Sequence, residues 1–211
     1  YHAKYITKEV TFQPTEATER GTRWHKQLED RLRDKLALPE ETAHFEPLIR
    51  RLEMMKGDKL PETKLAITKD FKPCEYRQRW YGGTADVIVL NHEDKKAVIF
   101  DYKTGKVKDN EDFRKQLTTY ALMAFIAYPH ITQIRVAYIF LDAMEYSPIE
   151  KGKKGLTFYR KDIEEMKSDL AFNIEKIARA TERNEWLPNP GGLCRPNKHS
   201  LLYKSPSPRH Y

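Results

Sequence analysis

The chain has 211 residues, a formal net charge of +7 and a sequence pI near 9.2. Hydrophobic residues make up 39% of it and charged residues 33%, so it is polar but can still build one sizeable core. No stretch approaches the roughly 18 continuous apolar residues of a membrane span, so we expect no membrane partner. The excess of positive charge favours a polyanionic partner over an acidic or neutral one.

The chain contains two cysteines, Cys74 and Cys194. They cannot form a disulfide framework, so a reducing, intracellular and cytoplasmic setting fits best. We expect a single domain over residues 1–211, with a core of about 15–183 and a basic tail, 186–211, that is rich in proline and glycine. The sequence leaves the oligomeric state open, with a monomer favoured.

The first half of the chain predicts two helices followed by strands. Apolar residues recur at helical spacing from Thr15 or Thr18 to about Leu36, and again over about 43–55. The glycine and proline of segment 57–61 end the second helix. We expect strands over 64–71, 74–80 and 84–90, and another in the apolar run that ends at Asp101.

The second half predicts a long helix over about 111–128, which Pro129 closes. Residues 133–141 are apolar enough for a central strand. A short strand over 156–159 and a helix over about 161–181 follow. This order of elements predicts an α/β fold with a mixed central sheet flanked by helices.

Two neighbouring strands carry an acid where their apolar run begins or ends. One begins with Gly83 to Asp86, and the other ends with Asp101 to Lys103. The short polar turn 91–96 predicts a hairpin that brings the two acids together, with Lys103 on the same side of its strand as Asp101. An acid at a strand end is more commonly a turn or cap residue, so the prediction depends on the combination.

Two carboxylates beside a lysine suit the hydrolysis of a phosphodiester. One or two Mg²⁺ or Mn²⁺ ions neutralise the phosphate and lower the pKa of the attacking water, and oxygen ligands suit these hard ions. We expect Asp86, Asp101 and the backbone carbonyl of Tyr102 to bind the metal. Lys103 would hold the attacking water or a phosphate oxygen. Thr104 would support these residues without binding the ion.

His25 and Glu29 lie one helical turn apart on the first predicted helix, so both can face the sheet edge. His25 is a candidate metal ligand whose imidazole would help the site accept Mn²⁺, and a buried or surface histidine is the alternative. Gly21, one turn earlier, favours the ligand, because glycine costs helix stability and often permits close approach. Glu29 is expected to form a salt bridge or to support the ligands.

Gln116 and Tyr120 have the same spacing on the long later helix. Their amide and phenol could hydrogen-bond a DNA phosphate or orient Lys103, and a place in the core is the alternative for Tyr120. Glu75 lies on the strand expected before Gly83. It could supply a further supporting carboxylate or face solvent.

The basic residues that follow Lys103 are the best candidates for phosphate contacts, although each alone could be a solvated surface charge. No base-reading motif is present, so we expect sequence-independent binding that weakens steeply with salt. The candidates are Lys106, Lys108, Arg114 and Lys115.

Taken in order, these motifs resemble those of the PD-(D/E)XK nuclease superfamily, specifically its RecB-like branch, which includes CRISPR-associated RecB-like and mitochondrial genome maintenance exonucleases. The family pattern is a helix histidine, a Gly-x-x-Asp strand, an Asp/Glu-x-Lys strand and a Gln-x-x-x-Tyr helix. The resemblance implies a restriction-endonuclease-like core, three metal ligands, a catalytic lysine, and active-site or DNA contacts from the last helix. The pattern falls here on the ligands His25, Asp86 and Asp101, on Lys103, and on Gln116 and Tyr120.

One feature departs from the family pattern. Many RecB-like exonucleases close with a C-terminal cysteine cluster that holds an iron–sulfur centre, whereas segment 186–196 contains only Cys194. Two cysteines cannot supply four thiolates, so we expect no iron–sulfur cluster. Compact members without the cluster occur among phage and mitochondrial exonucleases, so the resemblance is compatible with a phage origin and a phage-infected host cell.

The resemblance implies a metal-dependent exonuclease that acts on DNA ends, favours single strands, and serves recombination, repair or phage DNA processing. Two alternatives stay open: a structure- or sequence-specific endonuclease of the same superfamily, and a non-catalytic module that binds nucleic acid. A pure binder has no need for carboxylates that repel phosphate, so Asp86 and Asp101 argue against the second alternative.

Overall fold

The computed structural model describes residues 13–185 of the chain. The predicted tail, 186–211, and its Cys194 lie outside the described residues. Contacts divide the chain into two units, of which Thr11–Phe172 holds the sheet and the predicted site residues. The helical residues from Asn173 onward belong to the other unit. A single domain over 1–211 stays a prediction.

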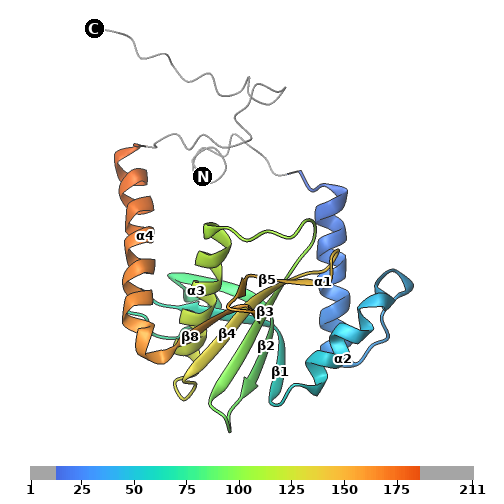
Figure 1. Cartoon of the computed structure of the whole chain (residues 1–211). Helices are drawn as coiled ribbons and strands as arrows, with labels where there is room; N and C mark the ends of the chain where they lie inside the picture. The colour runs from blue at the N-terminus through green and yellow to red at the C-terminus, as the bar shows by residue number, and fades with distance from the viewer. Residues whose placement is uncertain (1–12, 186–211) are drawn as a thin grey trace. The chain divides into compact units, whose positions relative to one another are not determined.

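The described residues form one mixed sheet in the spatial order β1-β2-β3-β4-β5, with β8 also paired to β4 (Figure 1). Neighbouring strands are antiparallel except β3 and β4, which run parallel. Sheet and flanking helices confirm the predicted α/β fold class. The strands are β1 (Asp58–Ile67), β2 (Tyr81–Asn91), β3 (Lys96–Lys103), β4 (Gln133–Phe140), β5 (Glu145–Ser147) and β8 (Leu156–Tyr159), with a separate ribbon of β6 (Ile149–Glu150) and β7 (Lys153–Lys154).

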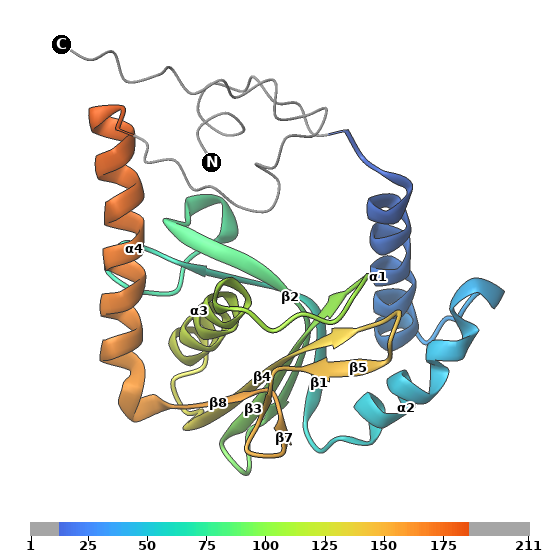
Figure 2. The ribbon, with the colours of Figure 1, turned by 45° about the horizontal axis from the view of Figure 1, so that its top comes forward.

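Helices cover both faces of this sheet (Figure 2). On one face, Trp24 and Leu28 of the first helix share a buried core with Val87 of β2. On the other face, Phe113 packs against Tyr138 of β4, with ring centroids 5.0 Å apart. The first face carries α1 (Glu16–Asp34) and α2 (Glu46–Met54), and the second carries α3 (Glu111–Ala127); α4 (Ile163–Arg183) and the short helices η2 (Glu40–Phe45), η3 (Tyr76–Gln78) and η4 (Arg160–Asp162) complete the set.

Side-chain caps begin the two helices that carry site residues. Thr15 accepts a hydrogen bond from the Thr18 backbone N–H at 3.3 Å and starts α1. Asn110 accepts one from the Phe113 backbone N–H at 3.0 Å and starts α3. Both helices occupy the positions that the sequence predicted.

The first two predicted strands need correction. β1 starts at Asp58 rather than at residue 64, because it is an edge strand, where Pro61 can lie without removing a ladder hydrogen bond. The strand predicted over 74–80 is wrong. The backbone there forms the short helix η3, closed by a hydrogen bond of 2.9 Å from Gln78 N–H to the Glu75 carbonyl.

The pairing of β2 with β3 stops short of the two acids. The last pair of this ladder is Val87 with Phe100, whereas β3 stays paired with β4 as far as Lys103. The backbone of β3 beyond Phe100 therefore has one free edge, and Asp86 and Asp101 lie at its beginning. Among residues 13–185, no helix has the length and apolar character needed to cross a bilayer.

Candidate active site

Asp86 is buried where the β2–β3 ladder ends. Its Oδ2 accepts a hydrogen bond from the Tyr102 backbone N–H, which the interrupted ladder leaves unpaired. Its Oδ1 lies 3.1 Å from Nδ1 of His25 on α1. The predicted hairpin therefore brings the carboxylate to the point where β2 and β3 separate, and the predicted histidine reaches it there.

Asp101 and Lys103 form the second part of the site. The Lys103 Nζ lies 2.6 Å from Asp101 Oδ2, and the Tyr120 hydroxyl donates to Asp101 Oδ1 at 2.9 Å. Burial raises the pKa of the Asp101 carboxyl above its ordinary value, although the positive charge of Lys103 opposes that rise. The lysine and the tyrosine thus contact both oxygens of this buried acid, and both oppose the effect of burial on its pKa.

Glu62 of β1 joins the site, and the sequence analysis did not find it. The pairs Pro61–Val87 and Thr63–Ala85 place Glu62 across from Asp86. Burial and the nearby Asp86 charge raise the pKa of Glu62 to about 7. Its backbone has a φ of 48°, a left-handed conformation that is rare for residues other than glycine. The predicted strand began at residue 64 and so left Glu62 out, whereas β1 begins at Asp58 and includes it.

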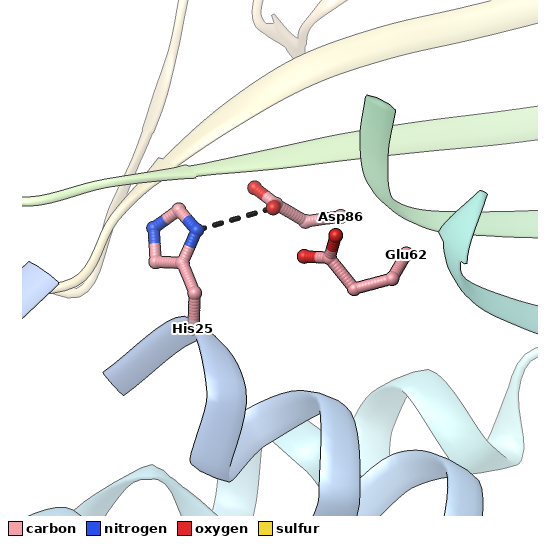
Figure 3. A group of neighbouring side chains, drawn as sticks. All are labelled: His25, Glu62 and Asp86. Atoms are coloured by element: carbon pink, nitrogen blue, oxygen red, sulfur yellow. Dashed lines mark ion pairs between the residues drawn. The ribbon is translucent and has the colours of Figure 1, made fainter. Parts of the chain in front are cut away.

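His25, Glu62 and Asp86 converge from α1, β1 and β2 (Figure 3). One ligand atom from each residue lies within 4.8 Å of those of the other two. Desolvation lowers the pKa of His25, but the hydrogen bond and charge of Asp86 outweigh it, so the pKa lies above its ordinary value. One imidazole nitrogen and two carboxylates are a donor set that fits a divalent ion such as Mg²⁺ or Mn²⁺.

An open hollow of about 380 Å³ adjoins these groups. A Cβ added at Gly21 of α1 would lie 3.1 Å from the Thr104 Oγ1, so glycine permits the close approach of helix and strand end. The hollow is lined by Ala17, Thr18, Gly21, Thr22, His25, Tyr102, Lys103 and Thr104.

A family model described as the PD-(D/E)XK nuclease superfamily matches residues 1–196. The chain belongs to this superfamily. The match is consistent with the RecB-like branch that the order of motifs indicated. Membership makes the chain a hydrolytic nuclease whose substrate is a nucleic acid and whose chemistry uses divalent metal ions.

Two further comparisons add little to the family assignment. A search of curated proteins finds no match to this nuclease. A crystal structure named "Putative exonuclease", from Eubacterium rectale, shares 11% identity, with 91% of this chain and 82% of that chain covered and a TM-score of 0.43.

Gln116 and Tyr120 of α3 form a hydrogen-bonded chain that ends at Asp101. The Tyr138 hydroxyl donates to Gln116 Oε1 at 2.8 Å, and Gln116 Nε2 donates to the Tyr120 hydroxyl at 3.3 Å. Tyr120 is itself buried, so it both packs in the core and contacts Asp101. Tyr120 thus has the core position that was one of the two alternatives, and its contact with a DNA phosphate or with Lys103 stays a prediction.

The predicted supporting residues lie at different distances from the site. Thr104 lines the hollow. Glu29 forms ion pairs with Lys26 at 3.2 Å and with Arg33. Glu75 is exposed before η3, outside the group formed by His25 and its two carboxylate neighbours.

The four predicted phosphate contacts fall into two pairs. Arg114 is held by Asp109 at 2.7 Å, and Lys115 by Glu111 at 2.7 Å. Lys106 and Lys108 are exposed on the loop after β3, and no carboxylate among residues 13–185 forms an ion pair with either. Lys106 and Lys108 are therefore available to bind an anionic ligand.

Proposed function

We propose that this chain is a metal-dependent exonuclease that hydrolyses DNA from its ends and favours single strands. The observation that supports it best is the convergence of His25, Glu62 and Asp86 beside the Asp101–Lys103 pair. Donors for a hard cation and a positive charge for a phosphate then lie at one sheet edge, within a member of a nuclease superfamily.

In this proposal His25, Glu62, Asp86 and Asp101 hold one or two ions of Mg²⁺ or Mn²⁺, and the Tyr102 carbonyl adds a backbone oxygen. A bound ion would supply charge neutralisation and a water of lowered pKa. The His25 side chain turns its Nδ1 toward Asp86, which orients both donors toward the shared position. The Tyr102 N–H fixes the second oxygen of Asp86, so that carboxylate has one preferred direction.

Lys103 acts as a point charge for the attacking water or for a non-bridging phosphate oxygen. Its Nζ is held by Asp101 and lies 5.0 Å from the centroid of the Tyr138 ring. Gln116 and Tyr120 hold Asp101 from the other side, so the lysine and its acid keep their geometry when a substrate displaces water. These two residues position the catalytic pair and, where the strand reaches them, contact its phosphates.

In this proposal, single-stranded DNA reaches the metal ligands through the hollow between α1 and the end of β3. Lys106 and Lys108 follow that strand end and contact the phosphate backbone. The process served, whether recombination, repair or phage DNA processing, and the monomeric state are predictions from the sequence.

The proposal is tested with end-labelled linear DNA and circular single-stranded DNA, each with Mg²⁺, Mn²⁺ or EDTA. We expect linear strands to be digested from an end in either metal, circles to survive, and EDTA to stop the reaction. Cleavage of circles would show an endonuclease. Binding without cleavage in every divalent metal would show a non-catalytic module.

A further inference from the structure

The loop that joins β1 to β2, residues 68–80, carries several exposed basic side chains. It contains four basic, two acidic and three aromatic residues. No carboxylate among residues 13–185 forms an ion pair with its basic groups or with Lys64 just before it. The four basic residues of the loop are Lys69, Lys72, Arg77 and Arg79.

Arg79 is held in one place although no acid among residues 13–185 forms an ion pair with it. Its Nη1 donates to the Tyr76 carbonyl at 2.5 Å, and its guanidinium lies 4.0 Å from the centroid of the Tyr76 ring. The aliphatic part of the Arg79 side chain lies against Gly82, and a Cβ added at Gly82 would be 2.5 Å from the Arg79 Cδ. The remaining N–H groups of an exposed and preorganised cation are therefore available to an anion.

The loop itself is anchored to the sheet. The Trp80 N–H donates to the Ile67 carbonyl at 2.9 Å, and the Cys74 N–H donates to the Ala66 carbonyl at 3.3 Å. Phe71 packs edge-on against Trp80, with ring centroids 5.7 Å apart. These contacts make the loop a continuation of the β1–β2 ribbon, so its cations keep a defined position relative to β2.

The same strand connects Arg79 with the candidate active site. Gly82, over which the arginine lies, precedes Asp86 by four residues in β2, which is about 13 Å along an extended strand. A Cβ at Gly83 would face Tyr120 of α3, so Gly82 and Arg79 lie on the face of the ribbon turned away from α3. A nucleic acid strand at the cleavage centre spans that distance within a few nucleotides.

We propose that Arg79, supported by Tyr76, binds the phosphate backbone of the single-stranded substrate a few nucleotides from the scissile bond. The inference rests on the proposed nuclease function and adds a second contact region to it. A planar guanidinium takes up phosphate oxygens in pairs, which a lysine cannot do. Cations interleaved with aromatic rings are the usual means of holding single strands without regard to sequence.

The test compares Arg79→Gln with Arg50→Gln, which removes the same charge from an exposed arginine of α2 that is paired with Glu46 at 3.2 Å. Binding of a labelled single strand of about 20 nucleotides is measured in EDTA over a series of salt concentrations. For Arg79→Gln we expect about a tenfold loss of affinity at low salt, since one charged contact is removed. The slope of log affinity against log salt falls by about 0.7 for each lost phosphate contact. Arg50→Gln keeps the wild-type affinity and slope.

Two additional measurements separate phosphate binding from a structural effect. Arg79→Lys keeps the charge, so it restores the salt slope but not the full affinity. A dinucleotide carries only the scissile phosphate and offers the loop none, so Arg79→Gln cleaves it at the wild-type rate in Mn²⁺ while it cleaves long strands more slowly at low concentration.

Wild-type affinity and slope in Arg79→Gln, or an equal loss in Arg50→Gln, would overturn the inference and leave the nuclease proposal intact. A wild-type protein that cleaves no DNA in any metal overturns the nuclease proposal itself. The two failures are therefore distinguishable.

Discussion

Two regions of the molecule hold carboxylates close to basic groups, and their pKa values shift in opposite directions. Between α1 and α2, Arg31 lies 2.7 Å from Glu46 and 3.0 Å from Glu53, and Lys35 lies 2.8 Å from Glu53. Hydrogen bonds from Arg31 to Glu46, and from Lys35 and Arg31 to Glu53, lower the pKa of both acids. We call this group the α1–α2 ion network.

At the candidate active site the balance is reversed. Burial raises the pKa of Glu62 and of Asp101, and the negative charge of Asp86 raises both further. Lys103 pairs with Asp101, and His25 pairs with Asp86. His25 is therefore the basic group of the site that lies near the charges of Glu62 and Asp86. The α1–α2 ion network supplies its own cations, whereas at the site no basic group among residues 13–185 forms an ion pair with Glu62, as expected where an external cation binds.

Cavity size alone would select a different region from the candidate site. The hollow beside Arg31, Glu46 and Glu53 has a volume of about 500 Å³, larger than the 380 Å³ next to His25. Its charged groups are already paired, so it offers an incoming ion or phosphate little that is free. Unpaired negative charge, and not cavity size, distinguishes the candidate site from this hollow.

The largest effect is expected from the catalytic pair. Lys103→Ala and Asp101→Ala should each lower the cleavage rate on the order of 10³-fold, because each removes a charge that acts on the reacting phosphate. Lys35→Ala, in the α1–α2 ion network, should keep nearly the wild-type rate. Rates are measured with linear DNA in Mn²⁺, and circular dichroism checks that each variant is folded. Wild-type rates in either site variant would refute their assignment.

The next effect concerns metal affinity. Glu62→Gln keeps the size of the side chain but removes one anionic donor, so Mn²⁺ should bind roughly 10- to 100-fold more weakly. Titration calorimetry in the absence of DNA measures this directly. Glu53→Gln is the matched control, since it removes a carboxylate that already has two cationic partners. Equal affinity in the two variants would show that Glu62 does not contact the ion.

The two regions should also respond to pH with opposite signs in EDTA. Glu53 has a lowered pKa, so its contribution to the free energy of unfolding is present above its ordinary pKa of 4.5 and is lost as the pH falls. Glu62 has a pKa raised to about 7, so its contribution is present below 4.5 and is lost as the pH rises toward 7.

Urea unfolding across this pH range should therefore separate the variants. Relative to wild type, Glu53→Gln loses stability as the pH rises through 4.5, and Glu62→Gln gains stability between 4.5 and 7. A difference between wild type and Glu62→Gln that does not change with pH would contradict the raised pKa.

The smallest effect is expected at Gly21, on the α1 turn before His25. Alanine there should favour the helix by about 1 kcal/mol, but its Cβ would lie 3.1 Å from the Thr104 Oγ1 and push the strand end away. We expect a few-fold slower cleavage with an unchanged or higher melting temperature. The double variant with Thr104→Ala should match Thr104→Ala alone, because the crowding atom is then gone. A double variant as slow as Gly21→Ala would rule out this contact.

Several site residues could be predicted because their relation is local. Asp101 and Lys103 are two residues apart on one strand, and alternation alone places them on the same side. Gln116 and Tyr120 are one helical turn apart, and the structure shows them hydrogen-bonded to each other. His25 is found on the predicted helix with its ring at Asp86.

Other positions were not predicted from the sequence, because each depends on a turn or a side-chain contact that the pattern of apolar residues does not show. Glu75 appeared to lie on a strand near the site, but its segment closes into the helix η3 and leaves it exposed. Arg114 and Lys115 follow Lys103 in sequence, yet each forms an ion pair with a nearby acid. The sequence did not single out Arg79. Only the structure shows that its guanidinium lies over the Tyr76 ring and that no carboxylate among residues 13–185 pairs with it.

By itself the sequence determined the long helices, the strands β2, β3, β4 and β8, and the acid–lysine motif, since these follow from spacing along one element. Only the tertiary structure decided that Glu62 joins His25 beside Asp86. Glu62 is 24 residues away in the chain, and it faces Asp86 because β1 pairs with β2 in an antiparallel register. Register depends on the hydrophobic pattern and the turn that joins the strands, and a shift of one residue would place Glu62 on the other face.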